Sequence, residues 1–145
     1  MLKKLMATNN DVAFTIVRVV LGIVFLAHGC QKMLGWFGGF GFHATMGFFT
    51  HMGMPAPLAF LIICTEFFGG LGLVLGLLTR IPALGIAGLM IGAIFMVHLQ
   101  NGFFMNWMGT QKGEGFEYHL LALAMAAAVL LRGAGAFSLD RALSK

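Results

Sequence analysis

Six ionisable side chains interrupt stretches of the sequence that are otherwise almost entirely apolar. They comprise two carboxylates, one amine and three imidazoles: Glu66, Glu117, Lys32, His28, His98 and His119. Carboxylates exchange protons, histidine transfers protons near neutral pH, and a lysine neutralises an acid or attracts an anion. These residue types together suit a site for a small polar head group, such as that of a quinone. Glu66, Glu117 and Lys32 are the candidate catalytic groups.

The three histidines, His28, His98 and His119, are the candidate cofactor-binding groups, because an imidazole donates or accepts hydrogen bonds with quinone oxygens. Two of them could instead ligate a b-type haem. No spacing rule selects a particular histidine pair, so haem is the minor alternative. The sequence contains no classical zinc, phosphate-loop or nucleotide-fold motif, and no metal site is predicted.

The composition shows what kind of protein must position these groups. Hydrophobic residues make up 59% of the 145 residues, and charged residues only 10%. Soluble domains contain about 25% charged residues, so this chain could not cover a water-facing surface, and lipid is the simplest solvent for it. The formal net charge of +4 comes from scattered residues. A nucleic-acid-binding protein would need a basic face instead.

Four apolar segments approach the length of about 20 residues that a membrane-spanning helix needs. They cover residues 12–33, 58–78, 82–99 and 116–132. The predicted fold is therefore all-α: one domain, residues 1–145, formed by a bundle of four transmembrane helices in a polytopic integral membrane protein.

The basic residues predict the orientation of this bundle, because lysine and arginine accumulate in cytoplasmic segments. One side would carry Lys3, Lys4, Arg18, Arg80, Arg132, Arg141 and Lys145, and the other Lys32 and Lys112. Both termini are therefore expected in the cytoplasm. The six candidate site residues then all map to the outer half of the bundle, whereas the inner half holds little that is polar beyond interfacial arginines.

The two predicted outer loops are rich in glycine and aromatic residues, at residues 35–42 and 103–107. Aromatic side chains favour the membrane interface. Phe42, Met46 and Phe49 recur at helical spacing, which predicts a short interfacial helix. The aromatic residues either anchor the protein at the interface or form a lid over a pocket.

Two glycine pairs lie four residues apart, Gly72 with Gly76 and Gly88 with Gly92. Such spacing lets helix backbones approach one another closely. It predicts a compact bundle and carries no information about chemistry.

The two cysteines, Cys30 and Cys64, fall inside apolar segments and belong to no CxxC motif. We expect them to be small buried hydrophobic residues, with a redox-active pair as the alternative. The sequence also lacks flavin, iron–sulfur and haem motifs. Electrons for any quinone chemistry must then come from a substrate thiol, a partner protein or these two cysteines.

The chain resembles the DoxX family of small bacterial membrane proteins over nearly its whole length. The matching segments, in order, are residues 18–22, 25–32, 37–41, 53–57, 66–70, 76–80, 98–104, 115–118 and 133–141. The resemblance implies a four-helix protein of the bacterial inner membrane with a redox role, since relatives include a quinone-reducing subunit. Many members have no assigned activity, and a family does not settle chemistry.

The leading hypothesis is an oxidoreductase component whose outer pocket binds a quinone or a small anionic substrate, with or without a redox partner protein. The alternative is a protein without catalytic activity that binds or transports a small solute or assists membrane assembly. The sequence leaves both alternatives open, and it leaves open whether the chain forms a homo-oligomer.

Overall fold

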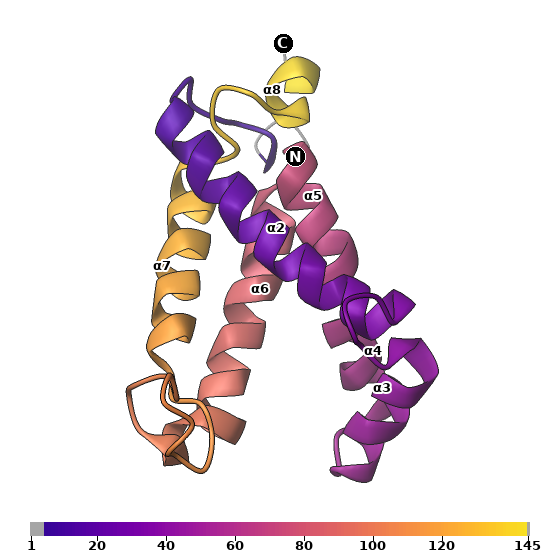
Figure 1. Cartoon of the computed structure of the whole chain (residues 1–145). Coiled ribbons are helices and arrows are strands. Elements are labelled where there is room, and N and C mark those ends of the chain that lie inside the picture. Colours follow the sequence, from indigo (N-terminus) through magenta and orange to yellow (C-terminus); the bar gives the residue numbers. More distant parts are fainter. Residues whose placement is uncertain (1–4, 145) are drawn as a thin grey trace.

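The computed structural model describes residues 5–144, and every regular element in this part of the chain is helical (Figure 1). Lys3, Lys4 and Lys145, which contribute to the predicted charge asymmetry, lie outside the described residues. The elements in order are α2 (Val12–Leu34), α3 (Gly41–His51), α4 (Ala56–Cys64), η1 (Thr65–Gly69), α5 (Gly70–Leu75), α6 (Arg80–Ala93), η2 (Ile94–His98), η3 (Leu99–Asn101), α7 (Glu117–Arg132) and α8 (Leu139–Ser144).

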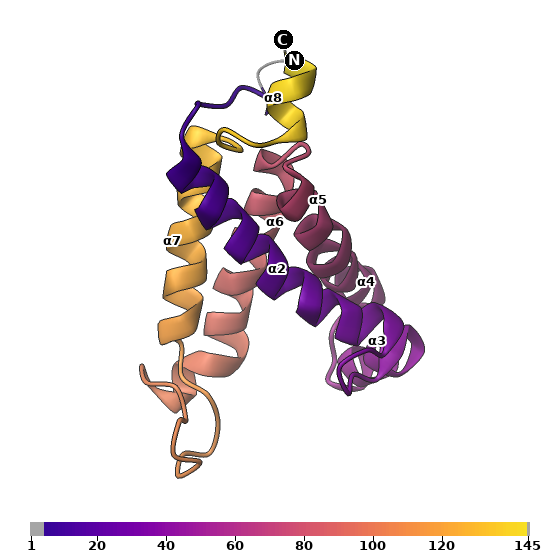
Figure 2. The same ribbon diagram turned by 45° about the horizontal axis from the view of Figure 1, so that its top comes forward.

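Among residues 5–144, three helices are long and apolar enough to cross a membrane. They are Val12–Leu34, Ala56–Leu75, which joins α4, η1 and α5, and Arg80–Asn101, which joins α6, η2 and η3. The prediction of an all-helical membrane protein is therefore confirmed. The fourth predicted segment corresponds to α7, which has 16 residues and lies beside α6 in both ribbon views (Figures 1 and 2).

Local sequence signals define the ends of these helices. The Asp11 side chain accepts a hydrogen bond of 2.8 Å from the Ala13 backbone and caps the start of α2. Gly35 and Gly76 end α2 and α5 with φ values of 75° and 72°, a left-handed conformation that glycine adopts without steric cost. Helix α3 occupies the place of the short helix predicted from Phe42, Met46 and Phe49.

The core lies where α2, α5, α6 and α7 meet. Its buried members are Leu21, Phe25, Leu73, Ala83, Ile86, Met90, Ala122, Ala126 and Val129. Most other large apolar side chains face outward, including Ile16, Leu84 and Leu121, which are 59%, 65% and 67% exposed. This outward apolar surface is what a lipid-embedded bundle requires, because lipid replaces water around it.

Glycine does allow helices to touch, but the closest approaches between helices lie outside the predicted pairs. Of those pairs, a methyl group added to Gly72 would lie 3.7 Å from Pro82 of α6. A methyl group added to Gly29 would lie 2.4 Å from the Phe67 backbone, and one on Gly70 would lie 2.4 Å from Leu26. These glycines bring α2 into backbone contact with the second long helix. Gly88 and Gly92 have no atoms of neighbouring helices within 4 Å of an added methyl group among the described residues. The four-residue spacing was thus a wrong guide to the packed face of α6.

After the predicted orientation, the end of the bundle that holds α8 and the start of α2 is called the inner end, and the opposite end the outer end. The inner end holds a buried polar cluster, where the sequence led us to expect only interfacial arginines. The Arg18 side chain is only 1% exposed, as is Asp140. Arg18 donates hydrogen bonds to the backbone oxygens of Ala134 at 2.8 Å, Val74 at 2.9 Å and Phe137 at 2.6 Å, and also to that of Leu73. These bonds tie α2 to α5 and to the segment that follows α7.

Asp140, the second member of this inner cluster, holds the turn between α5 and α6. Its carboxylate accepts bonds from the Leu78 and Thr79 backbone N–H groups at 2.6 and 3.0 Å, and from the Thr79 hydroxyl at 2.8 Å. Helix α8 and the start of α2 consequently lie at the same end of the molecule (Figures 1 and 2). The α6–α7 loop lies at the opposite end, where α3 and α4 diverge from α6 and α7.

Candidate functional site

Lys32 and Glu66 form an ion pair between the outer end of α2 and the second long helix. The Lys32 Nζ and Glu66 Oε2 atoms are 2.5 Å apart, and the side chains are 24% and 7% exposed. Of the two candidate carboxylates, the structure pairs Lys32 with Glu66 and not with Glu117. A buried carboxylate needs such a partner, because an unpaired charge in an apolar environment is costly.

The backbone that carries Glu66 is unusual. Residues Thr65–Gly69 form a π-helical turn between α4 and α5, and Glu66 lies on it. A π-turn inserts an extra residue into a helix, and such turns occur frequently at functional sites. This turn packs against both α2 and α6. Glu66 enters the interior of the bundle, whereas Phe68 of the same turn is 58% exposed.

The helix Arg80–Asn101 also contains a π-turn that carries an ionisable side chain. Residues Ile94–His98 form another π-helical turn, which ends at His98. The His98 ring lies against the His119 ring of α7, with 4.1 Å between the ring centroids. The two histidines that the sequence placed on different helices are therefore in direct contact.

The hydrogen bonds of these histidines differ. The His98 Nδ1 atom lies 2.8 Å from the Glu114 carbonyl oxygen, and a carbonyl oxygen accepts, so Nδ1 carries the proton. His119 is 6% exposed, and its Nδ1 atom has no hydrogen-bond partner in the described part of the chain. A buried polar atom without a partner is uncommon and indicates a place for a proton, a water or a ligand.

Tyr118 lies beside the histidine pair and was not among the predicted site residues. Its ring lies 5.5 Å from the His119 ring and packs against the buried core. It is the single tyrosine of the chain and directly follows Glu117. A lone tyrosine among phenylalanines was the signal that could have identified it, since only tyrosine adds a hydroxyl to the ring.

The structure does not bring Glu117 and His28 into this group. Glu117 is held by the α6–α7 loop, where its Oε1 atom accepts bonds from the Met105 N–H at 2.9 Å and the Trp107 Nε1–H at 3.3 Å. His28 is exposed on α2, although it lies one helical turn from Lys32. The six predicted residues therefore form two contacting pairs, one loop-bound carboxylate and one outward-facing histidine.

No group of three or more metal-ligating side chains is present among residues 5–144. Cys30 and Cys64 are both free thiols, Cys30 buried and Cys64 half-buried. The arrangement offers hydrogen-bond donors, one charged pair and one buried histidine nitrogen, which is the equipment for exchanging protons with a small polar ligand.

Comparison with known proteins gives this arrangement a family context. The DoxX family model matches residues 13–99. Inner membrane protein YqjF of Escherichia coli K12 is 32% identical over 94% of this chain and 95% of its own length. Putative oxidoreductase CatD of Bacillus subtilis 168 is 34% identical over 93% of this chain and 90% of its own length.

A third relative, an uncharacterized membrane protein of Mycobacterium tuberculosis, is 31% identical over 89% of this chain and 80% of its own length. No solved structure matches the chain significantly. The matched region contains Lys32, Glu66 and His98, and the resemblance predicted from the sequence motifs is confirmed. The chain belongs to the DoxX family of membrane proteins.

Proposed function

We propose that this protein is a quinone-binding redox component of the bacterial inner membrane. The observation that carries the proposal is the Lys32–Glu66 pair at 2.5 Å on a π-helical turn, in a segment surrounded by apolar residues. Ionisable groups in a membrane are expensive and usually functional. The printed names of the relatives, an inner membrane protein and a putative oxidoreductase, agree with this assignment.

The proposed head-group site lies between the Lys32–Glu66 pair and the His98–His119 pair, with Tyr118 beside the histidines. Lys32 and Tyr118 donate hydrogen bonds to the ligand oxygens, because both carry polar hydrogens in this region. Glu66 and the free His119 nitrogen exchange the two protons that quinone reduction to quinol takes up. The two electrons come from a reduced thiol or a reduced partner protein, so the chain acts as one component of a redox system.

The same proposal includes α7 as a fourth membrane-spanning helix. Its 16 residues run alongside α6 and contact α2, and a short apolar helix is accommodated by local thinning of the bilayer. An even number of crossings places both ends of the chain on one side, in agreement with the excess of basic residues there.

Quinone binding tests the proposed function directly. We expect the protein purified in a mild detergent to contain extractable quinone, or to gain thermal stability from added menadione. Glu66→Gln and Lys32→Met should each lower menadione affinity at least tenfold. Glu114→Gln is the matched control, because it removes an outer carboxylate without touching the pair, and its affinity should stay within twofold of the parent.

Two outcomes would contradict the quinone assignment. One is a parent protein that is free of quinone and does not respond to menadione. The other is a Glu66→Gln variant with unchanged affinity. A quinone-free protein that is stabilised by a small anion would instead support the alternative function, solute binding without redox chemistry.

Cysteine labelling tests the topology separately. In a Cys30→Ser, Cys64→Ser background, Thr110→Cys should react with a membrane-impermeant maleimide added to intact cells. Ser144→Cys should react only after the cells are opened. Labelling of both positions from outside would exclude an even number of membrane crossings.

A further inference from the structure

A cavity of about 470 Å³ lies beside the outer end of α7, apart from the Lys32–Glu66 pair. Its lining residues come from the α6–α7 loop and the first turns of α7: Phe103, Met105, Trp107, Glu117, Tyr118, Leu120 and Leu121. This volume is within the range of small-molecule sites. The cavity combines Phe103, Trp107 and Tyr118 with a single carboxylate. Of these residues the proposed quinone chemistry uses only Tyr118, and it gives no role to Glu117 or Trp107.

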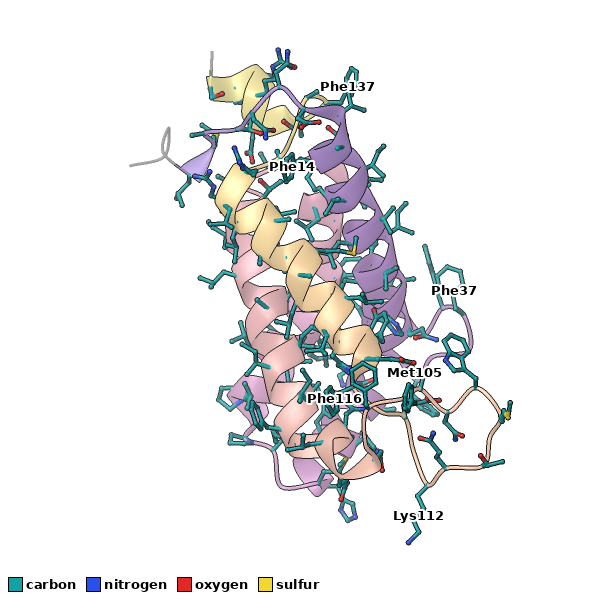
Figure 3. All side chains as sticks on the ribbon, turned by 90° about the vertical axis from the view of Figure 1, so that its left-hand side faces the viewer. Phe14, Phe37, Met105, Lys112, Phe116 and Phe137 are labelled. Carbon is teal, nitrogen blue, oxygen red and sulfur yellow. The ribbon has the colours of Figure 1, made fainter. Side chains whose placement is uncertain are left out.

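The carboxylate of Glu117 has hydrogen-bond donors but no cationic partner in the described part of the chain. The Met105 and Trp107 N–H groups both donate to its Oε1 atom. Lys32 is already paired with Glu66. Lys112, the lysine of the same loop, lies at the loop tip and points away from the helices (Figure 3). Glu117 therefore gives the cavity an uncompensated negative charge.

The aromatic side chains around this charge are fixed in place yet accessible. Phe103 is held by ring contacts with Phe104 and Phe116 at 5.2 and 5.5 Å. Trp107 is 86% exposed, although its indole N–H is bound to Glu117. An indole ring that is oriented by its own hydrogen bond and open to solvent presents a face for a ligand.

The lower wall of the cavity is apolar and faces away from the bundle. Leu120 and Leu121 are 43% and 67% exposed on the outer surface of α7. In a bilayer these leucines would meet acyl chains, while the loop above them lies at the level of the head groups. A ligand that fills the cavity would then need a charged head and an apolar tail.

We propose that this cavity binds an amphiphilic organic cation, with its ammonium group against Glu117 and the Trp107 ring and its alkyl part along Leu120 and Leu121. Aromatic rings attract ammonium groups through their negative faces, Trp most strongly, and a carboxylate adds direct charge complementarity. An anionic ligand would be repelled by Glu117, and a neutral one would gain nothing from it. The chemistry is shared by free long-chain amines and by lipids with an ammonium head group.

Fluorescence of Trp107 provides the test. The chain has two tryptophans, so Trp36→Phe leaves Trp107 as the single indole fluorophore. This protein, in maltoside detergent, is titrated with decyltrimethylammonium and, in parallel, with the uncharged alcohol decanol. We expect a saturable change in Trp107 emission with the cation that is at least tenfold more sensitive than any change with the alcohol.

Two carboxylate variants in the Trp36→Phe background separate this site from general charge effects. Glu117→Gln keeps the hydrogen-bond acceptor for Met105 and Trp107 but removes the charge, and it should weaken cation binding at least tenfold. Glu114→Gln removes an equal charge from the same loop outside the cavity, and it should leave affinity within twofold. Melting curves in the same detergent check that both variants are folded.

The source of the cation is distinguished by mass spectrometry of co-purified lipid. Enrichment of phosphatidylethanolamine over phosphatidylglycerol in the parent, lost in Glu117→Gln, identifies a lipid head group; no enrichment together with tight decyltrimethylammonium binding identifies a free amine. An equal response to decanol, or unchanged cation affinity in folded Glu117→Gln, overturns the proposal and leaves Trp107 as an interfacial anchor.

Discussion

The two cations of α2 meet very different surroundings. Arg18, near the inner end, is 1% exposed and donates to four backbone carbonyl oxygens. Lys32, near the outer end, remains 24% exposed and has a single carboxylate partner. The sequence assigned Arg18 to the cytoplasmic interface and Lys32 to the candidate site, but it did not predict that Arg18 is the more deeply buried of the two.

The inner cluster and the outer pairs differ in how much of their hydrogen-bonding capacity is used. At the inner end, Arg18 and Asp140 are surrounded by backbone groups from three other segments, and these bonds fix the helix ends. At the outer end, Lys32 keeps two of its three ammonium hydrogens for other acceptors, and the buried His119 Nδ1 atom has no partner in the described chain. We infer that the inner cluster stabilises the fold and that the outer pairs are left free to bind.

The largest expected effect is on Arg18. Arg18→Met should lower the free energy of unfolding by about 3–5 kcal/mol, because it leaves several buried carbonyl oxygens without their donors, at about 1–3 kcal/mol for each unsatisfied group. Thermal melting in detergent measures the loss. Arg141→Met is the control: Arg141 is half-buried and bonds to Asn10 and Ala136, and its loss should cost under about 1 kcal/mol. Equal melting temperatures of the two variants would contradict the inference that the buried Arg18 cluster stabilises the fold.

A smaller loss is expected where α2 touches the second long helix. Gly29→Ala places a methyl group 2.4 Å from the Phe67 backbone, and overpacking of this kind costs about 1–3 kcal/mol. It also shifts the π-turn next to Glu66. Gly88→Ala, which has no atoms of neighbouring helices within 4 Å among the described residues, should melt like the parent. A destabilised Gly88→Ala variant would show that α6 has a partner outside this chain.

Much of the fold followed from the sequence because lipid makes the physical requirement simple. Long apolar segments must be helical, and the helices Val12–Leu34 and Arg80–Asn101 start or end within a few residues of the predicted segments. The packing of those helices did not follow in the same way. The spacing of Gly88 and Gly92 satisfied a frequent pattern, but contact depends on which face meets a neighbour, and a single sequence does not specify that face.

The candidate site shows the same limit at the level of side chains. Depth along the helices predicted that all six candidate residues lie at the same end of the bundle, without selecting pairs. The structure brings Lys32 to Glu66 and His98 to His119. Depth could not distinguish Glu117, whose carboxylate turns toward its loop, from Tyr118, whose ring packs toward His119. Neighbouring residues on a helix point in different directions. The sequence indicated the depth of each residue in the bundle but not the rotation of α7 about its own axis.

The outer ion pair should contribute less stability than the inner cluster. Lys32→Met and Glu66→Gln should each lower the free energy of unfolding by about 1–3 kcal/mol, the range for hydrogen bonds to charged groups. The double variant should recover most of this loss, because neither residue then leaves an unpaired charge. Melting of the parent, the two single variants and the double variant in detergent gives the coupling free energy between Lys32 and Glu66. Additive losses in the double variant would show that the two residues act independently and that the pair in the structure carries no energy.

The smallest effect on stability is expected at the cysteines, although each lies close in sequence to one member of the outer pair. Cys30 lies two residues before Lys32, and Cys64 two residues before Glu66, so both thiols belong to the outer half of the bundle. Both are free, one buried and one half-buried, and a buried thiol behaves as a small apolar group. Cys30→Ser and Cys64→Ser should therefore change the free energy of unfolding by about 1 kcal/mol or less, within the usual range of mild substitutions, and leave menadione binding unchanged.

If the thiols instead supply electrons to a quinone, each single variant should abolish turnover with a reducing partner while the melting temperature stays the same. Complete and equal inactivation by both single variants would show that the outer half of the bundle performs thiol redox chemistry. The cysteines would then be the catalytic groups in place of Glu66.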